Sequence, residues 1–190
     1  MLYLNFRIKS TCFNEIDWRV KKMDKHIQDK LKVFYDRLTT VKNSGVILHA
    51  WSDESDTEDG EILTEIYEFL SEDEVYNELN ADWAEAYIQL FALEFEVFHE
   101  GAIAYYANVY EFNDYNTLLK TAEYFKTNGY DEIYNIYAPA IYDYSGLKWS
   151  EFPKEWTDKA GIVGKWIDNN IDKVYYCMLD ILMKNIKKVI

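Results

Sequence analysis

Apolar residues recur at spacings of three and four along most of this chain, with polar residues between them. This periodicity is typical of amphipathic helices that bury one face. The long stretch in the middle of the chain is apolar on almost every side, which predicts a helix at the centre of the core. Helices are predicted over residues 16–41, 62–70, from 71 onward, 82–110, 117–125, 131–142, 155–165 and 171–189.

Short polar signals mark where two of these helices begin. Ser71 followed by Glu74 has the pattern of a capping box, in which each side chain bonds a free backbone N–H of the first turn. Asn80 or Asp82 is suited to be the N-cap of the long central helix. The sequence therefore predicts one uninterrupted helix from this cap to about residue 110.

Glycine and proline are scarce, with seven Gly and two Pro in 190 residues. This scarcity favours long helices over a β-sandwich with many turns. Gly129 stands where a glycine commonly ends a helix in the left-handed conformation. Pro139 is expected to kink its helix, and Gly161 and Gly164 are expected to interrupt the weak helix around them.

The first residues follow a different pattern, because apolar and polar side chains alternate from 2 to 9. This period of two predicts a short strand, and the apolar run at 46–51 could pair with it or form a buried connector. The predicted fold is mostly α: a compact multi-helix single domain with an optional short N-terminal β-strand pair. Within it we distinguish an N-terminal strand and helix extension, an acidic segment and a helical core, over residues 1–51, 52–80 and 80–190.

Charge is distributed very unevenly along the chain. Residues 43–119 contain nineteen Asp or Glu and no Lys or Arg, whereas residues 1–50 carry ten Lys or Arg against five acids. The formal net charge is −14. Such a middle segment repels bare nucleic acid and anionic membranes and attracts basic proteins. The predicted partner is a basic, nucleic-acid-binding protein, and no direct contact with nucleic acid or membranes is expected. The charge distribution does not decide whether the protein forms a homodimer.

Composition argues that this acidic chain nevertheless folds. Hydrophobic residues make up 49% of it and aromatic residues 17%, whereas disordered acidic chains are poor in aromatics. Ten tyrosines fall between residues 105 and 144. Without nearby cations they do not suit base stacking, so we interpret them as core packing or as part of a protein interface.

The two cysteines, Cys12 and Cys177, are too few and too far apart for a disulfide framework or a zinc site. The first residues lack the basic head and continuous apolar stretch of a signal peptide, and no run of eighteen apolar residues occurs. These features predict a cytoplasmic protein with reduced thiols.

Motifs for catalysis or metal binding are incomplete. Glu96 and His99 supply one Glu-x-x-His pair, but di-metal helix bundles need a second. The acidic loop at 53–61 lacks the glycine at the sixth position and the glutamate at the twelfth position of a calcium loop, counted from Asp53. There is no nucleophile elbow, phosphate loop or Cys–His signature. We therefore predict no enzyme activity, no metal and no cofactor.

The carboxylates themselves are the candidate site. Glu94, Glu96 and Glu100 lie on the apolar central helix, so some of them are expected to be structural. The exposed, partner-binding candidates are the acids of the loop and of the short helices that follow: Asp53, Glu54, Asp56, Glu58, Asp59, Glu61, Glu65, Glu68, Glu72, Asp73, Glu74, Glu78, Asp82 and Glu85.

Residues 96–108, EVFHEGAIAYYAN, resemble the signature of the DNA mimic protein 19-like family. That signature has Glu-Val, then Asn-Gly-Gly-Phe, then two aromatics and Asn. The similarity covers about residues 80–145, and His99 with its neighbours departs from the usual pattern. The positions that fit in register, beside Val97, are Glu96, Gly101, Tyr105, Tyr106 and Asn108.

The resemblance implies a compact helical fold and, for the founding member, a negative surface that imitates DNA. Function transfers poorly across such families, but the charge distribution points independently to the same reading. The first hypothesis is a DNA-mimicking inhibitor that occupies the basic surface of a nucleic-acid-binding protein, in phage counter-defence or transcriptional control. The alternatives are an immunity protein that neutralises a basic toxin nuclease, or an acidic scaffold domain without catalysis.

Overall fold

The computed structural model describes residues 23–44, 58–113, 115–142 and 151–190. Within these ranges every regular element is helical, which confirms the predicted mostly α, compact multi-helix fold. The elements are α1 (Lys25–Ser44), α2 (Glu58–Ser71), α3 (Asp73–Leu79), α4 (Asp82–His99), α5 (Ala102–Asn113), α6 (Tyr115–Thr127), α7 (Asp131–Tyr137), the 3₁₀ turn η1 (Ala138–Ala140), α8 (Lys154–Asn169) and α9 (Ile171–Val189).

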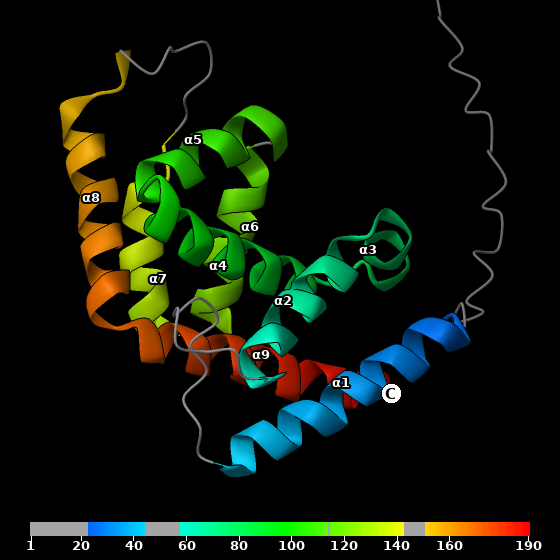
Figure 1. Cartoon of the computed structure of the whole chain (residues 1–190). Coiled ribbons are helices and arrows are strands. Elements are labelled where there is room, and N and C mark those ends of the chain that lie inside the picture. Colours follow the sequence, from blue (N-terminus) through cyan, green and yellow to red (C-terminus); the bar gives the residue numbers. More distant parts are fainter. Residues whose placement is uncertain (1–22, 45–57, 114, 143–150) are drawn as a thin grey trace, which may run out of the picture.

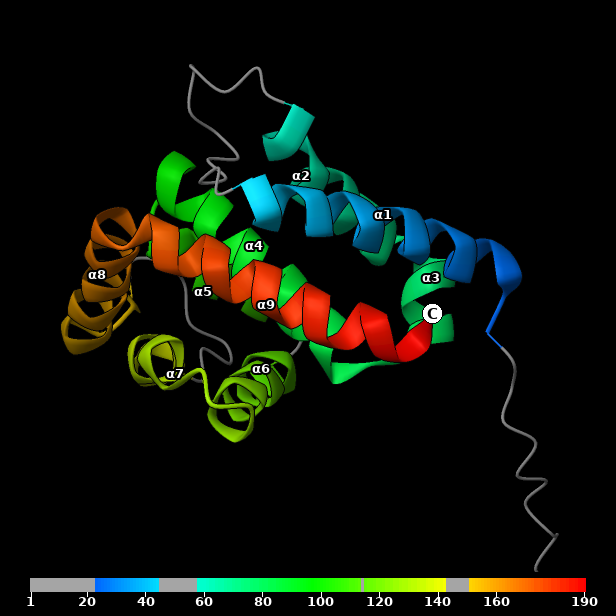
Figure 2. The same cartoon turned by 90° about the horizontal axis from the view of Figure 1, so that it is seen from below.

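Helix α4 lies at the centre of the fold and contacts α2, α5, α6, α8 and α9 (Figure 1). Seen from below, α1 and α9 lie side by side along one side, and α6 and α7 neighbour each other on another (Figure 2). The central position follows from the sequence, because α4 buries Trp83, Tyr87, Leu90, Phe91 and Leu93 around much of its circumference. The predicted core helix is thus confirmed in its position.

The predicted length of the central helix is wrong, since α4 ends at His99 and α5 starts at Ala102. The break lies at Gly101, whose φ of +90° is in the left-handed region. The backbone N–H groups of Glu100 and Gly101 both donate to the Glu96 carbonyl, at 2.8 and 2.7 Å. Glycine adopts this conformation without steric cost, so the chain reverses here and lets α5 fold back onto α4.

The predicted caps are also wrong. Ser71 is the last residue of α2, and Glu72 is the N-cap of α3 without a side-chain cap hydrogen bond. The N-cap of α4 is Ala81, between the two predicted candidates. Asn80 instead ends α3, in the left-handed conformation with a φ of 39°, and its N–H donates to the Tyr76 carbonyl. Asparagine tolerates this conformation better than most residues, which lets the chain turn within two residues.

Glycines and the proline act differently from prediction in the second half of the chain. Helix α8 runs uninterrupted through Gly161 and Gly164. A Cβ atom added at Gly164 would lie 3.9 Å from the Cβ of Ala102, which is ordinary van der Waals contact. Pro139 does not kink a long helix; α7 ends at Tyr137 and η1 follows. Helix α8 stays continuous because packing of its buried face outweighs the low helix propensity of glycine. That face consists of Trp156, Ala160, Val163 and Ile167.

Other predictions about the elements are confirmed or fall outside the described residues. Helix α9 covers the predicted terminal helix, and Gly129 follows α6 with a φ of +79°. The first predicted helix is described only from Lys25, as α1. The predicted strand at the N-terminus and its partner at 46–51 lie outside the described residues and stay predictions.

Replacing Gly101 with alanine is expected to lower the free energy of unfolding by about 1–2 kcal/mol, because a Cβ is strained at this φ. No atom lies within 4 Å of the added methyl group, so the cost comes from the backbone alone. The matched control is Gly161→Ala in the exposed interior of α8, which is expected to stabilise by about 0.5–1 kcal/mol. Urea unfolding measures both; equal effects of the two variants would contradict the assignment of the break to Gly101.

Candidate functional site

Five of the predicted partner-binding acids lie in the last turn of α2, between the two helices and on α3. We call this the α3 acidic surface: Glu68, Glu72, Asp73, Glu74 and Glu78. The first four are exposed, and Glu78 is half-buried. Helix α3 has only seven residues and buries Val75 alone, so most of its side chains face solvent. Asp73 and Glu74 lie in its first turn, where the helix dipole stabilises negative charge.

The exposed acids of this surface remain available to a partner. Glu68, Glu72, Asp73 and Glu74 make no ion pair with any residue that the structure describes. Helix α3 is the part of the fold that projects beside α2 at the edge of the molecule (Figure 1). These four acids are therefore hydrated carboxylates without an ion-pair partner among the described residues.

Several predicted acids do not belong to this surface. Asp53, Glu54 and Asp56 lie outside the described residues. Only the backbone of α2 is described at the next three: Glu58, Asp59 and Glu61.

Glu65 already has an internal partner. The Arg37 guanidinium on α1 donates to both carboxylate oxygens, at 2.6 and 3.1 Å. This hydrogen bonding, helped by the positive charges of Arg37 and Lys30, lowers the pKa of Glu65. Glu65 therefore attaches α2 to α1, although its place in the acidic segment predicted that it binds a partner.

Glu94 fulfils the expectation that some acids of the central helix are structural. Its side chain is fully buried on α4, and the Tyr175 hydroxyl on α9 donates to its Oε1 at 2.8 Å. A buried carboxyl is tolerated only when it is hydrogen-bonded, so this contact ties the C-terminal helix to the centre of the fold.

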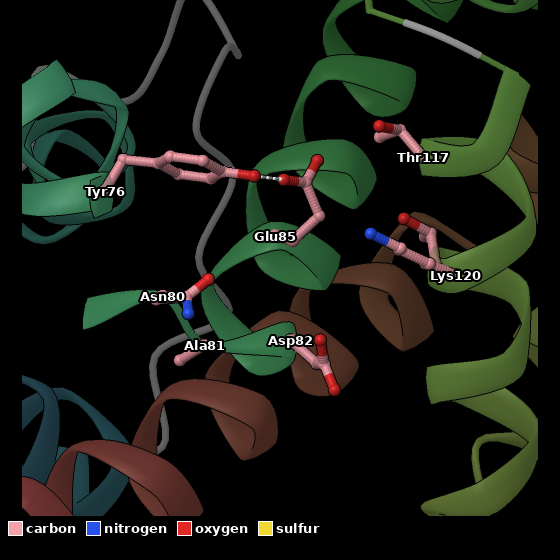
Figure 3. Close-up of a pocket in the computed structure, with 8 residues that line it drawn as sticks. Tyr76, Asn80, Ala81, Asp82, Glu85, Thr117 and Lys120 are labelled. Carbon is pink, nitrogen blue, oxygen red and sulfur yellow. Dashed lines mark hydrogen bonds between the residues drawn. The ribbon is translucent and has the colours of Figure 1, made fainter. Parts of the chain in front are cut away.

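The remaining two predicted acids, Asp82 and Glu85, line a small pocket between α3, α4 and α6 (Figure 3). The pocket has a volume of about 80 Å³. The Tyr76 hydroxyl on α3 donates to Glu85 Oε2 across it. We call it the Glu85 pocket, and its lining residues are Tyr76, Asn80, Ala81, Asp82, Glu85, Thr117, Lys120 and Thr121.

A chain of hydrogen bonds leads from this pocket into the core. Gln89 Nε2 donates to Glu85 Oε1 at 2.7 Å, and the Tyr105 hydroxyl donates to Gln89 Oε1 at 3.0 Å. The hydroxyls of Tyr105 and Tyr137 lie 2.7 Å apart. Tyr106 completes the cluster by donating to the Tyr137 carbonyl at 2.9 Å. The pocket is thus the outer end of a buried polar network.

This network gives the residues of the family-like motif a structural role. Gly101 makes the turn between α4 and α5, and the Glu96 carbonyl accepts the hydrogen bonds of that turn. Tyr105 and Tyr106 are fully buried and join α5 to α7. The side chain of Asn108 lies outside the described part of α5. The motif therefore supports the core and does not form the acidic surface.

Sequence reasoning missed Gln89, Thr121, Tyr137 and Lys120 as parts of this arrangement. One signal was present for Gln89, which follows Glu85 by four residues and so shares its face on an otherwise apolar helix. No local pattern could place Lys120 on α6 beside a pocket of α4.

Comparison with protein-family models, with curated proteins and with solved structures finds no match for this chain. The resemblance to the DNA mimic protein 19-like family therefore stays a prediction. Among the described residues, no group of three or more His, Cys, Asp or Glu is arranged to hold a metal ion. None of the described helices combines the length and the apolar character that crossing a membrane requires.

Substituting Tyr105 with phenylalanine is expected to lower the free energy of unfolding by about 1–3 kcal/mol, because Gln89 and Tyr137 lose a buried partner. The control is Tyr134→Phe, since the Tyr134 hydroxyl makes no hydrogen bond with a described residue. It is expected to change stability by less than about 0.5 kcal/mol. Chemical denaturation compares the two; similar losses would argue against the network.

Alkaline pH is expected to destabilise the protein from about pH 10 upward. Burial, helped by Glu85, raises the pKa of Tyr76 to about 12, and burial raises the pKa of Tyr105 and Tyr137 further above their ordinary value of 10.0. The folded state holds these protons more tightly than the unfolded state. The stabilisation is therefore complete below pH 10 and declines as pH rises through the folded pKa values.

Urea unfolding at a series of pH values, with the ultraviolet absorbance of tyrosinate recorded in parallel, measures this decline. A free energy of unfolding that stays constant between about pH 10 and 12 would show that these phenols are not protected.

Proposed function

We propose that this protein is an acidic inhibitor that occupies the basic surface of a nucleic-acid-binding protein in the place of DNA. The observation that carries the proposal is the α3 acidic surface, where Glu68, Glu72, Asp73 and Glu74 are exposed and form no ion pair with a described residue. Surface carboxylates without internal cations attract a cationic partner over the distance of a Debye length, about 8–10 Å near physiological salt.

The density of charge on α3 supports mimicry of a nucleic-acid backbone. Its seven residues include Asp73, Glu74 and Glu78. At about 1.5 Å of rise per residue, this is roughly one carboxylate per 3.5 Å of helix axis. One strand of duplex DNA carries one phosphate charge per ~3.4 Å. A basic surface built to meet a row of phosphates would therefore meet a similar linear charge here.

The sequence around α3 supports the same function, because no Lys or Arg occurs between residues 43 and 119. The carboxylates of this segment are consequently neutralised only by residues distant in the chain, as Glu65 is by Arg37. Electrostatic complementarity of this kind speeds association more than it tightens the complex, and salt weakens it strongly.

Charge reversal tests the proposal. The triple variant Glu68→Lys, Glu72→Lys and Glu74→Lys is expected to lower the association rate with basic DNA-binding proteins by about 10-fold or more at low salt. The proteins are captured from host lysate on the immobilised unmodified chain, eluted with salt and identified. Association is then measured for each purified protein, with duplex DNA as a competitor.

The matched control reverses three acids on α8, in Glu155→Lys, Asp158→Lys and Asp168→Lys, which changes the net charge by the same amount. These residues are exposed, and their helix α8 lies on the other side of the molecule from α3 (Figure 1). Equal loss from both triple variants would show that only net charge matters and would remove the α3 acidic surface from the proposal. Absence of any captured basic protein at low ionic strength would refute the function itself.

A further inference from the structure

The Glu85 pocket contains two carboxylates that lack a cationic partner. Asp82 and Glu85 come from the first turns of α4, and Lys120 comes from α6 on the opposite wall (Figure 3). Neither carboxylate forms an ion pair with Lys120 or with any other described residue. Lys120 is the only basic residue of the lining, so the lining residues carry a net negative charge.

The hydrogen bonds behind the pocket are all directed toward Glu85. Gln89 Oε1 can only accept, so the single hydroxyl proton of Tyr105 is committed to it, and Tyr137 must then donate to Tyr105. The amide group of Gln89 donates to Glu85 Oε1, and Tyr76 donates to Oε2. Glu85 is therefore held as a fixed acceptor, and each oxygen keeps a second lone pair.

A buried hydroxyl on the wall also lacks a hydrogen bond. Thr121 is 1% exposed and lines the pocket, and its Oγ1 has no hydrogen-bond partner among the described residues. It lies beside the Tyr137 hydroxyl without completing a hydrogen bond to it. Buried polar groups are normally satisfied, so this oxygen indicates a group that is contributed from outside the chain.

We infer that the Glu85 pocket binds a guanidinium group, the head of an arginine side chain presented by the basic partner. This inference rests on the proposed function and assigns one contact of it. A guanidinium is planar and has five donors in a fixed fork, which suits acceptors arranged around a small pocket. It also stacks on aromatic rings, and Tyr76, 41% exposed, provides one at the pocket.

The position of the pocket links this contact to the α3 acidic surface. Tyr76 belongs to α3 itself, one turn after Asp73, and Asp82 follows α3 directly in the chain. An arginine seated against Glu85 would therefore hold the surrounding basic surface against the carboxylates of α3. A shallower depression of about 500 Å³ shares Asp82 and Lys120 with the pocket and leaves room for residues that flank the arginine. Partly buried anchors of this type commonly dominate the stability of an interface.

Binding of N-acetyl-arginine amide, followed by NMR of the pocket residues, tests the inference without a protein partner. The arginine probe is expected to shift the signals of Lys120 and Thr121, while N-acetyl-citrulline amide, its neutral isostere, does not. N-acetyl-lysine amide is expected to bind about 5-fold more weakly, because an ammonium cannot match the planar fork. Equal binding of citrulline or of lysine would overturn the inference.

Three variants complete the experiment. Glu85→Gln is expected to weaken arginine binding about 5-fold or more, since it removes the charge at the fixed acceptor. Glu100→Gln makes the same change at the exposed far end of α4 and is expected to leave binding unchanged within about 2-fold. Lys120→Gln removes the one competing cation from an exposed position and is expected to tighten binding. Weaker arginine binding in Lys120→Gln would contradict the inference, because the removal of a competing cation does not weaken binding of another cation at the same site.

Failure of the inference can be separated from failure of the proposed function. If the arginine probe does not bind but the charge reversal on α3 still slows association with a basic protein, only the pocket assignment is wrong. If the probe binds and no basic protein associates with the chain, the pocket is a guanidinium site and the inhibitor function is wrong.

Discussion

The need to hydrogen-bond polar side chains on the central helix organises this fold. Helix α4 packs against five other helices, yet it carries Glu85, Gln89 and Glu94 on faces turned toward them. Tyr105 from α5 donates to Gln89, and Tyr175 from α9 donates to one carboxylate oxygen of Glu94. Because a buried polar group without a partner costs a large part of the net stability, these contacts fix which neighbour meets which face of α4.

The acids in the middle of the chain fall into two groups: some join helices to one another, and others are exposed on α3. Two of these acids hold helices together: the half-buried Glu65 binds Arg37 on α1, and the fully buried Glu94 accepts a hydrogen bond from Tyr175 on α9. The exposed acids of α3 are carried on a seven-residue helix that is anchored by Val75 and by the hydrogen bond of Tyr76 to Glu85. The proposed binding surface is consequently small and attached to a rigid support, which lowers the entropy lost on association.

The family-like motif and the proposed site occupy different parts of the molecule. Gly101 and the two adjacent tyrosines, Tyr105 and Tyr106, build the turn and the core contacts of α5. A similar motif in another chain would therefore indicate a similar packing of two helices, and the surface charges would be free to differ. The proposed contacts with a partner therefore lie at the carboxylates of α3 and the Glu85 pocket, and not at the motif.

The sequence by itself determined the helical class, the central position of α4 and the terminal helix, because these depend on the spacing of apolar residues. The sequence also located the acids of α3, since the carboxylates of residues 43–119 have no Lys or Arg nearby in the chain to pair with. Only the tertiary structure decided that Gly101 ends α4, that Glu65 is paired and that Lys120 faces Glu85. The contacts of Glu65 and Lys120 join helices distant in the chain, and the break at Gly101 is a left-handed backbone conformation within an apolar run; the spacing of apolar residues carries no information about either.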